Sequence, residues 1–145
     1  MDGVLTDSGI YLFNDGTQAR KFHAKDGEGI KRLIKKGVQV AILTGSREEG
    51  IVTKRSQMLH ISPELVSLDT ADKLATLKAW VEREQITLKE IAYIGDDLPD
   101  IPVLEVVGLS VCPNDAAPKV KAMVDLVLEK NGGEGCVREF VDQLL

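Results

Sequence analysis

The most chemically informative stretch of the sequence is Gly95-Asp96-Asp97-Leu98-Pro99-Asp100, which carries three closely spaced carboxylates. Carboxylates this close repel one another unless a cation balances them, and magnesium prefers a few carboxylates together with water and a substrate phosphate. We therefore expect a Mg²⁺ site with Asp96 as the direct ligand. Asp97 and Asp100 would act through water or by orienting their neighbours. Acidic capping of the following helix is an alternative that explains one of these residues but not all three.

Two further residues are suited to binding a phosphoryl group. Thr44 follows the apolar run 38–43, and its hydroxyl, with the next backbone N–H groups at Gly45 and beyond, can hydrogen-bond a phosphoryl oxygen. Lys73 stands at the start of a predicted helix, whose N-terminus itself favours anions. Taken singly, each has a plainer alternative: a Thr-Gly turn for Thr44 and a solvated surface cation for Lys73.

Short apolar strands of the parallel type alternate with helices along the chain. Residues 9–22 predict a β-hairpin, because Asn14-Asp15-Gly16 tolerates the positive φ of a tight turn. Asp26 is expected to cap the first helix and Gly37 to end it. The predicted strands are 38–43, 65–68, 90–94, 108–111 and 126–128, and the predicted helices are 26–36, 47–58, 71–84, 100–106, 115–123 and 134–145.

This alternation predicts an α/β fold, a doubly wound (Rossmann-like) parallel sheet with a β-hairpin insertion near the N-terminus and no cap domain. We expect one domain over residues 1–145. Ligands of such sheets bind at the carboxyl ends of the strands, and Thr44-Gly45 and Gly95-Asp96-Asp97 both fall there. The strand that should lead into Met1-Asp2 would be central, and the sequence has no residues for it.

Composition argues against two classes of partner, and the small-molecule partner that we expect is a sugar phosphate, as the resemblance described below implies. The net charge of -5, with both signs interspersed, argues against nucleic acid and against an anionic membrane surface. No apolar run has the length of a membrane span, and no basic leader precedes an apolar stretch. Cys112 and Cys136 lie in different segments without metal-ligand spacing, so we expect two buried free thiols in a cytoplasmic protein.

The opening residues Met1-Asp2-Gly3-Val4-Leu5-Thr6-Asp7 resemble the nucleophile motif of the haloacid dehalogenase superfamily of phosphohydrolases, Asp-x-Asp-Gly-x-x-Thr, and residues 94–100 resemble its magnesium motif. The resemblance implies an aspartyl-phosphate mechanism. Asp2 would protonate the leaving oxygen, deprotonate the attacking water and bind Mg²⁺ through its backbone carbonyl. Thr44 would hold the phosphoryl group and Lys73 would neutralise it.

The opening motif is incomplete, because its first Asp, the attacking residue in this superfamily, would lie one position before Met1. A start codon assigned too late, a trimmed chain and a truncated, inactive relative are three explanations. We favour the first, because the other site residues are present. Residues 1–145 alone are then expected to show little magnesium-dependent phosphatase activity, and about eight preceding residues ending in Asp should restore it.

The sequence is similar over its whole length to a small capless branch of the superfamily, through the 9–22 hairpin and the segment 132–139 as well as the motifs above. The branch implies a sugar-acid phosphate as substrate, with 3-deoxy-D-manno-octulosonate 8-phosphate ahead of a nine-carbon sialic-acid-type 9-phosphate. It also implies a homotetramer. Four cations are candidates for the sugar's carboxylate or phosphate, although each is equally suited to the surface: Lys25, Arg47, Arg55 and Arg138.

Two rival functions remain to be weighed. A response-regulator receiver domain shares the doubly wound sheet but places its acidic pair before its Thr and Lys, whereas residues 96–100 here follow Thr44 and Lys73. A non-catalytic binding or assembly subunit would keep the tetramer and bind a sugar phosphate without cleaving it. Calorimetry with eight-carbon and nine-carbon sugar phosphates, beside a phosphate-release assay, separates binder from enzyme.

Overall fold

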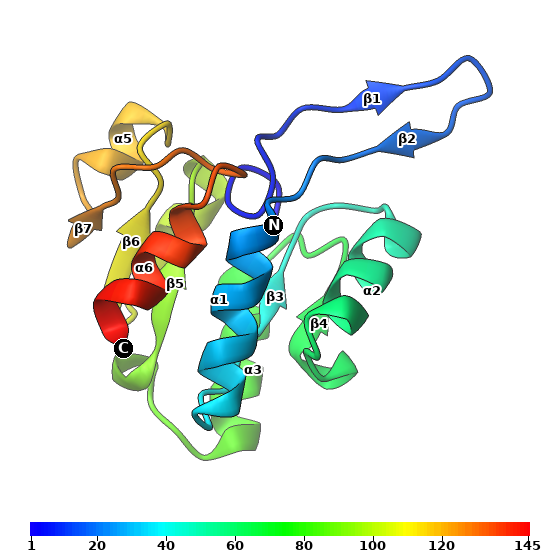
Figure 1. The fold of residues 1–145 in the computed structure, drawn as a ribbon. Coiled ribbons are helices and arrows are strands. Elements are labelled where there is room, and N and C mark those ends of the chain that lie inside the picture. The colour runs from blue at the N-terminus through cyan, green and yellow to red at the C-terminus, as the bar shows by residue number, and fades with distance from the viewer.

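The computed structural model describes residues 1–145 as an α/β fold whose central parallel strands form two groups with helices on both faces (Figure 1). β3 (Ile42–Leu43) pairs in parallel with β4 (Val66–Ser67). β6 (Leu109–Cys112) pairs in parallel with both β5 (Ala92–Ile94) and β7 (Leu126–Val127). The doubly wound architecture expected from the sequence is confirmed, and no cap domain is present.

Six α-helices and three short 3-10 helices connect these strands. The α-helices are α1 (Ala24–Lys35), α2 (Glu49–Met58), α3 (Lys73–Glu84), α4 (Ile101–Leu104), α5 (Pro118–Lys121) and α6 (Cys136–Leu144), and the 3-10 helices are η1 (Pro63–Leu65), η2 (Leu88–Glu90) and η3 (Leu98–Asp100). The longest of them have 12 residues, and none is long and apolar enough to cross a bilayer.

Neighbouring residues of β3 define the layers. Ile42 belongs to the main core cluster with Ile30 of α1 and Phe140 of α6, whereas Leu43 packs with Leu77 of α3 and Val103 of α4. Successive residues of a strand face opposite sides of a sheet. Helices α1 and α6 therefore cover one face and α3 and α4 the other, with α1 and α6 in front in Figure 1.

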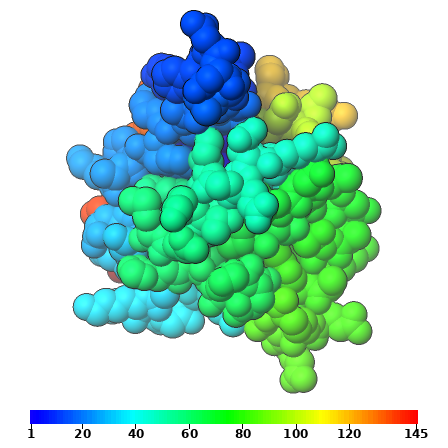
Figure 2. Space-filling view, turned by 90° about the vertical axis from the view of Figure 1, so that its right-hand side faces the viewer, coloured from blue at the N-terminus to red at the C-terminus, as the bar shows by residue number.

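The predicted hairpin is confirmed as β1 (Tyr11–Leu12) and β2 (Gln18–Ala19), an antiparallel pair. Gly16 in its turn has φ +84°, a conformation that glycine adopts without strain. Figure 2 shows the hairpin, in dark blue, standing above the rest of the surface. Its apolar side chains remain open to solvent: Ile10, Tyr11, Leu12 and Phe13 are each more than half exposed.

Two local expectations need correction. The strand predicted over 38–43 is reduced to Ile42–Leu43, because β3 has a hydrogen-bonding neighbour on one side only, and Val38 is exposed. Asp26 does not cap α1: the N-cap is His23. The buried Asp26 carboxylate instead accepts the backbone N–H of Arg138 at 2.8 Å and ties α1 to α6. Gly37 ends α1 as expected, with φ +85°.

Candidate active site

The N-terminal residues form a tight turn at the carboxyl ends of the strands. The Met1 carbonyl accepts the N–H groups of Val4 (3.2 Å) and Leu5 (2.8 Å), and the Thr6 hydroxyl donates to the Asp2 carboxylate at 3.2 Å. Met1 lines the same pocket as Asp96 and Asp100. The turn therefore lies beside the charged cluster that the following paragraphs describe.

The Gly-rich segment 132–135 holds this turn in place. The Gly133 N–H donates to the Val4 carbonyl at 2.9 Å. A Cβ built on Gly132 would overlap the Gly3 carbonyl, and one built on Gly133 would overlap the backbone of Thr6 and Asp7. The segment thus needs glycine for close backbone approach to the N-terminal turn.

Asp96 meets the N-terminal turn from the far end of the sequence. It follows β5, and a Cβ built on Gly3, which has φ +77°, would overlap the Asp96 carboxylate. Burial, followed by the charges of Asp100 and Asp97, raises the pKa of Asp96 to about 6. Burial and the neighbouring acids therefore disfavour the charged form of Asp96, and a cation bound to its carboxylate would favour that form.

Both carboxylate oxygens of Asp100 are occupied by hydrogen bonds from other residues of the cluster. It accepts hydrogen bonds from Lys73 Nζ (2.7 Å) and the Tyr93 hydroxyl (2.6 Å) on one oxygen, and from the Asp96 and Asp97 N–H groups on the other. Burial alone would raise the pKa of Asp100, but the bonds from Lys73 and Tyr93 lower it below its usual value. Asp100 is therefore ionised, and it fixes both Lys73 and the loop that carries Asp96.

Thr44 follows the last residue of β3 and is buried. A backbone hydrogen bond joins it to the loop that precedes Lys73. Its carbonyl accepts the Thr70 N–H at 3.0 Å, three residues before Lys73. Its Oγ1 accepts the Ser46 N–H at 3.1 Å, so the hydroxyl proton is available for another acceptor. A Cβ on Gly45 would meet no atom within 4 Å, so space is open beside this backbone.

Sequence reasoning missed two residues of the site. Arg20 Nε lies 3.7 Å from the Asp2 carboxylate, and the Arg20 side chain is only 6% exposed. Tyr93 places its hydroxyl on Asp100, and burial, together with that carboxylate, raises the pKa of the hydroxyl. A tyrosine in a short buried strand was the available signal, since a buried Tyr hydroxyl usually needs a partner. Nothing in the sequence pattern marks Arg20.

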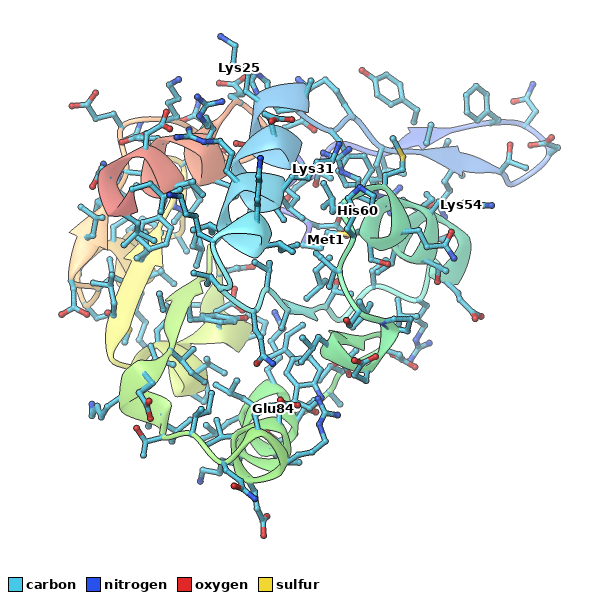
Figure 3. The ribbon with its side chains drawn as sticks, turned by 60° about the horizontal axis from the view of Figure 1, so that its bottom comes forward. Met1, Lys25, Lys31, Lys54, His60 and Glu84 are labelled. Atoms are coloured by element: carbon cyan, nitrogen blue, oxygen red, sulfur yellow. The ribbon has the colours of Figure 1, made fainter.

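The four candidate cations for the sugar lie in different settings. Lys25 is exposed on the first turn of α1 and projects into solvent (Figure 3). Arg47 is 82% exposed and pairs with Asp69 at 2.9 Å. Arg55 lies over the Phe22 ring, 4.8 Å from its centroid, and its Nη2 donates to the His23 carbonyl. Arg138 binds Asp142 one helical turn further on.

The cluster does not form a complete cage for a cation by itself. No three His, Cys, Asp or Glu side chains converge closely enough to hold a metal ion. The Asp97 carboxylate accepts the Leu98 N–H at 2.8 Å and caps η3, as the capping alternative predicted for one of the acids. The fit to Mg²⁺ rests on the Asp96 carboxylate. Mg²⁺ usually keeps several waters and binds substrate phosphate, so it needs only one or two protein carboxylates.

Comparison with known proteins identifies the family to which this fold and these motifs belong. Residues 51–140 match the family model of haloacid dehalogenase-like hydrolases. The chain is 39% identical to the 3-deoxy-D-manno-octulosonate 8-phosphate phosphatase KdsC of Escherichia coli K12, over all of this chain and 76% of that protein. The crystal structure of the Yersinia pestis phosphatase of the same name superposes with a TM-score of 0.95 at 38% identity, covering 99% of this chain and 76% of that one.

A third relative was solved with ligands. The Moraxella catarrhalis 3-deoxy-D-manno-octulosonate 8-phosphate phosphatase, in complex with magnesium ion, phosphate ion and a KDO molecule, superposes with a TM-score of 0.94 at 33% identity. The match covers 99% of this chain and 81% of that one.

Proposed function

The chain belongs to the haloacid dehalogenase-like hydrolases. From this premise we propose that it acts as a Mg²⁺-dependent phosphatase of 3-deoxy-D-manno-octulosonate 8-phosphate. It is a phosphoric monoester hydrolase by family. The substrate is inferred from relatives named 3-deoxy-D-manno-octulosonate 8-phosphate phosphatase, which are 39% identical to this chain over its full length. The observation that carries the proposal is the contact between Asp96 and the Gly3 backbone, which joins the two acidic motifs at one point.

Each site residue has a role that its surroundings support. Asp2 gives a proton to the leaving oxygen and later takes one from water, and Arg20 and Thr6 hold its carboxylate in position. Thr44 donates its free hydroxyl proton to a phosphoryl oxygen, beside the open backbone at Gly45. Lys73, fixed by Asp100, adds positive charge next to the phosphate.

Asp96 and the backbone carbonyl of Asp2 are the residues that would hold Mg²⁺, with Asp97 and Asp100 acting through water or through the loop. When bound, the ion supplies charge that neutralises the phosphate and polarises its oxygens. The raised pKa of Asp96 is consistent with this assignment, because a bound cation would favour the charged carboxylate that burial and Asp100 disfavour. Lys25 and Arg47 are the exposed cations proposed for the sugar's carboxylate. Arg47 is paired with Asp69 but is 82% exposed, whereas Arg55 and Arg138 are only partly exposed and bind other groups of the chain.

Calorimetry tests this proposal with residues that the structure places. Titration of 3-deoxy-D-manno-octulosonate 8-phosphate in the presence of Mg²⁺ should give saturable binding that Asp96→Asn weakens at least tenfold. Omitting Mg²⁺ should have the same effect. A nine-carbon sialic-acid-type 9-phosphate is the competing ligand, and tighter binding of it would transfer the assignment to that substrate. Binding that ignores both Mg²⁺ and Asp96→Asn would contradict the proposed site.

We also propose a homotetramer, because the projecting hairpin carries four apolar side chains that water would otherwise solvate. We place the protein in the cytoplasm, because Cys112 and Cys136 are both free and buried. We propose that residues 1–145 belong to one haloacid-dehalogenase-like domain.

A further inference from the structure

The loops that follow β3 and β4 are joined beyond the ends of the two strands. β3 and β4 pair in parallel and lie side by side (Figure 1), so both loops leave the sheet at its carboxyl edge. Three backbone hydrogen bonds of 3.0 Å connect these loops: Thr44 N–H to the Ser67 carbonyl, Asp69 N–H to the Ser46 carbonyl and Thr70 N–H to the Thr44 carbonyl. The segment 44–47 is therefore fixed against the segment 67–70, which leads towards Lys73.

Asp69 binds the first loop through its side chain as well as through its backbone. Its Oδ1 accepts a hydrogen bond from Arg47 Nε at 2.9 Å, beside the backbone bond to Ser46. Asp69 has φ +46°, in the left-handed region that residues other than glycine adopt infrequently. Such a conformation persists only where its surroundings hold it, and it recurs at functional sites. Asp69 is thus a strained residue with two contacts to one neighbouring segment.

The ion pair between Arg47 and Asp69 does little for the stability of the fold. Both side chains are largely exposed to solvent, and ion pairs of this kind contribute little to the free energy of unfolding. The consequence of the pair is the direction of the long Arg47 side chain. Glu48 and Glu49 follow Arg47 directly and offer competing carboxylates, so pairing with Asp69 keeps the guanidinium on the side of the loop after β4.

The guanidinium of Arg47 keeps an unused edge. Asp69 occupies only Nε, whereas the terminal nitrogens Nη1 and Nη2 bind no group of the chain. Two adjacent guanidinium N–H groups can bind one carboxylate through two parallel hydrogen bonds. Lys25, the other exposed candidate cation, projects into solvent (Figure 3). Arg47 is therefore held in place and is still free to bind an anion.

We propose that Asp69 is a positioning residue for the carboxylate of the substrate. It holds Arg47 so that Nη1 and Nη2 bind the carboxylate of a ligand whose phosphoryl group lies at Thr44. This inference rests on the proposed function and names the chemical class that the site prefers, which is phosphates of sugar acids over phosphates of neutral sugars. A neutral sugar phosphate has no carboxylate, so it gains nothing from the pair.

Competition is the opposite role for the same pair. If the substrate's carboxylate had to displace Asp69 from Arg47, removal of the Asp69 carboxylate would tighten binding. If Asp69 positions Arg47, its removal weakens binding, because the Arg47 side chain must then be ordered when the ligand arrives. The direction of the effect therefore separates the two roles.

The test measures ligand binding by calorimetry with chain 1–145 and Mg²⁺. The ligands are 3-deoxy-D-manno-octulosonate 8-phosphate, a nine-carbon sialic-acid-type 9-phosphate and, as a phosphate without a carboxylate, ribose 5-phosphate. The variants are Asp69→Gly, Asp69→Asn, Arg47→Met and the double variant Asp69→Gly with Arg47→Met. Glycine adopts the positive φ without strain, and Asn keeps an Oδ1 acceptor in a conformation that it tolerates.

Asp69→Gly should weaken binding of the sugar-acid phosphate about fivefold, the factor expected when one long side chain must be ordered on binding. It should leave ribose 5-phosphate unchanged, and Asp69→Asn should recover most of the affinity. In the Arg47→Met background, Asp69→Gly should have no further effect, since the two residues act through one contact. Tighter binding by Asp69→Gly would overturn the proposal. A loss that persists without Arg47, or that extends to ribose 5-phosphate, would overturn it too, because it would show that Asp69 only supports the loop.

Gln85→Gly is the matched control for the backbone. Gln85 has φ +55° and is exposed at the C-cap of α3, whose opposite end carries Lys73. Both glycine variants remove the same kind of strain, so their thermal midpoints should change alike, and Gln85→Gly should leave all affinities unchanged. A loss of affinity confined to Asp69→Gly then reports on Arg47 and not on folding.

The three ligands separate this inference from the proposed function. If the 8-phosphate binds and Asp69→Gly has no effect, the positioning role fails and the proposed function stands. If the nine-carbon 9-phosphate binds more tightly and shows the Asp69 effect, the positioning role stands and the proposed substrate fails. If ribose 5-phosphate binds as tightly as both sugar acids, both fail.

Discussion

At the scale of single residues, the two acids Asp96 and Asp100 differ in the charged groups that surround them. Asp96 is a half-buried carboxylate among other carboxylates, whereas Asp100 has Lys73 and Tyr93 as donors. The two acids stand four positions apart and have opposite pKa shifts. The neighbours of each acid, and not its place in the motif, therefore decide which one is available to a cation.

Asp96→Asn should stabilise the metal-free protein at pH 7. Because the pKa of Asp96 is raised from 3.8 to about 6, the folded chain binds more protons than the unfolded chain in this interval. Its free energy of unfolding therefore falls as pH rises through the interval. The gain from Asn is about 1 kcal/mol at pH 7, after discounting solvent screening, and should vanish below the unfolded pKa. Urea unfolding at pH 7 and at low pH measures it, and Asp97→Asn, at an exposed capping acid, should change stability little.

Lys73→Met should destabilise the protein by about 3 kcal/mol at pH 7, because it leaves the buried Asp100 charge without its partner. The loss should shrink in acid. The lowered pKa of Asp100 means that its ionised form stabilises the fold above the unfolded pKa, and that this contribution is lost as pH falls through the folded pKa. Lys78→Met, one turn further along α3 and exposed, is the matched control. Equal losses for the two variants would argue against the buried pair.

At the scale of elements, close backbone contacts bring distant segments together. The N-terminal turn is held between the loop after β5 and the glycines that precede α6. Side chains at Gly3, Gly132 or Gly133 would separate these segments. The site therefore depends on three loops whose positions are set by the helices and strands behind them.

Gly3→Ala should weaken Mg²⁺ binding, because its Cβ would displace the Asp96 carboxylate. Its positive φ adds about 1 kcal/mol of backbone strain. Gly16→Ala has a similar φ and open space, so it carries the strain without the overlap. Calorimetric titration of Mg²⁺ compares the two. A loss of affinity in both variants, or in neither, would show that the Gly3–Asp96 contact does not shape the metal site.

At the scale of the whole molecule, the hairpin carries four consecutive apolar residues that are open to solvent, Ile10 to Phe13. Leu12 is 71% exposed and Tyr11 60%. The charged and polar residues that surround the site contribute nothing to covering these side chains, so association of copies through the hairpin is the simplest way to bury them.

Leu12→Lys combined with Tyr11→Lys should shift the protein from the proposed tetramer towards monomer while its circular dichroism stays unchanged. The reason is that charges at these positions would have to be desolvated in the assembled state. Light scattering over a range of concentrations measures the mass. Met58→Lys, an equally exposed apolar position on α2, should leave the mass unaltered. A monomeric parent chain would refute the tetramer.

The sequence by itself determined the layered fold and the positions of Thr44 and Asp96 after the parallel strands β3 and β5. Short apolar runs predict strands, and apolar residues at helical spacing predict helices. Polar residues that directly follow parallel strands lie at the same edge of the sheet, where the carboxyl ends of the strands are. Thr44 and Asp96 follow from that rule. The rule depends on local pattern and on a general property of parallel sheets, so it survives without knowledge of any specific contact.

Only the tertiary structure decided what each charged group does. That Asp100 binds Lys73 and Tyr93, that Asp26 binds the start of α6 instead of capping α1, and that Arg20 is buried against Asp2 all depend on residues far away in the chain. The shortened β3 has the same cause. Hydrogen bonds and packing contacts join residues that are far apart in the sequence. A sequence pattern can therefore indicate a strand or an acidic residue, but it does not identify the residue that binds or packs against it.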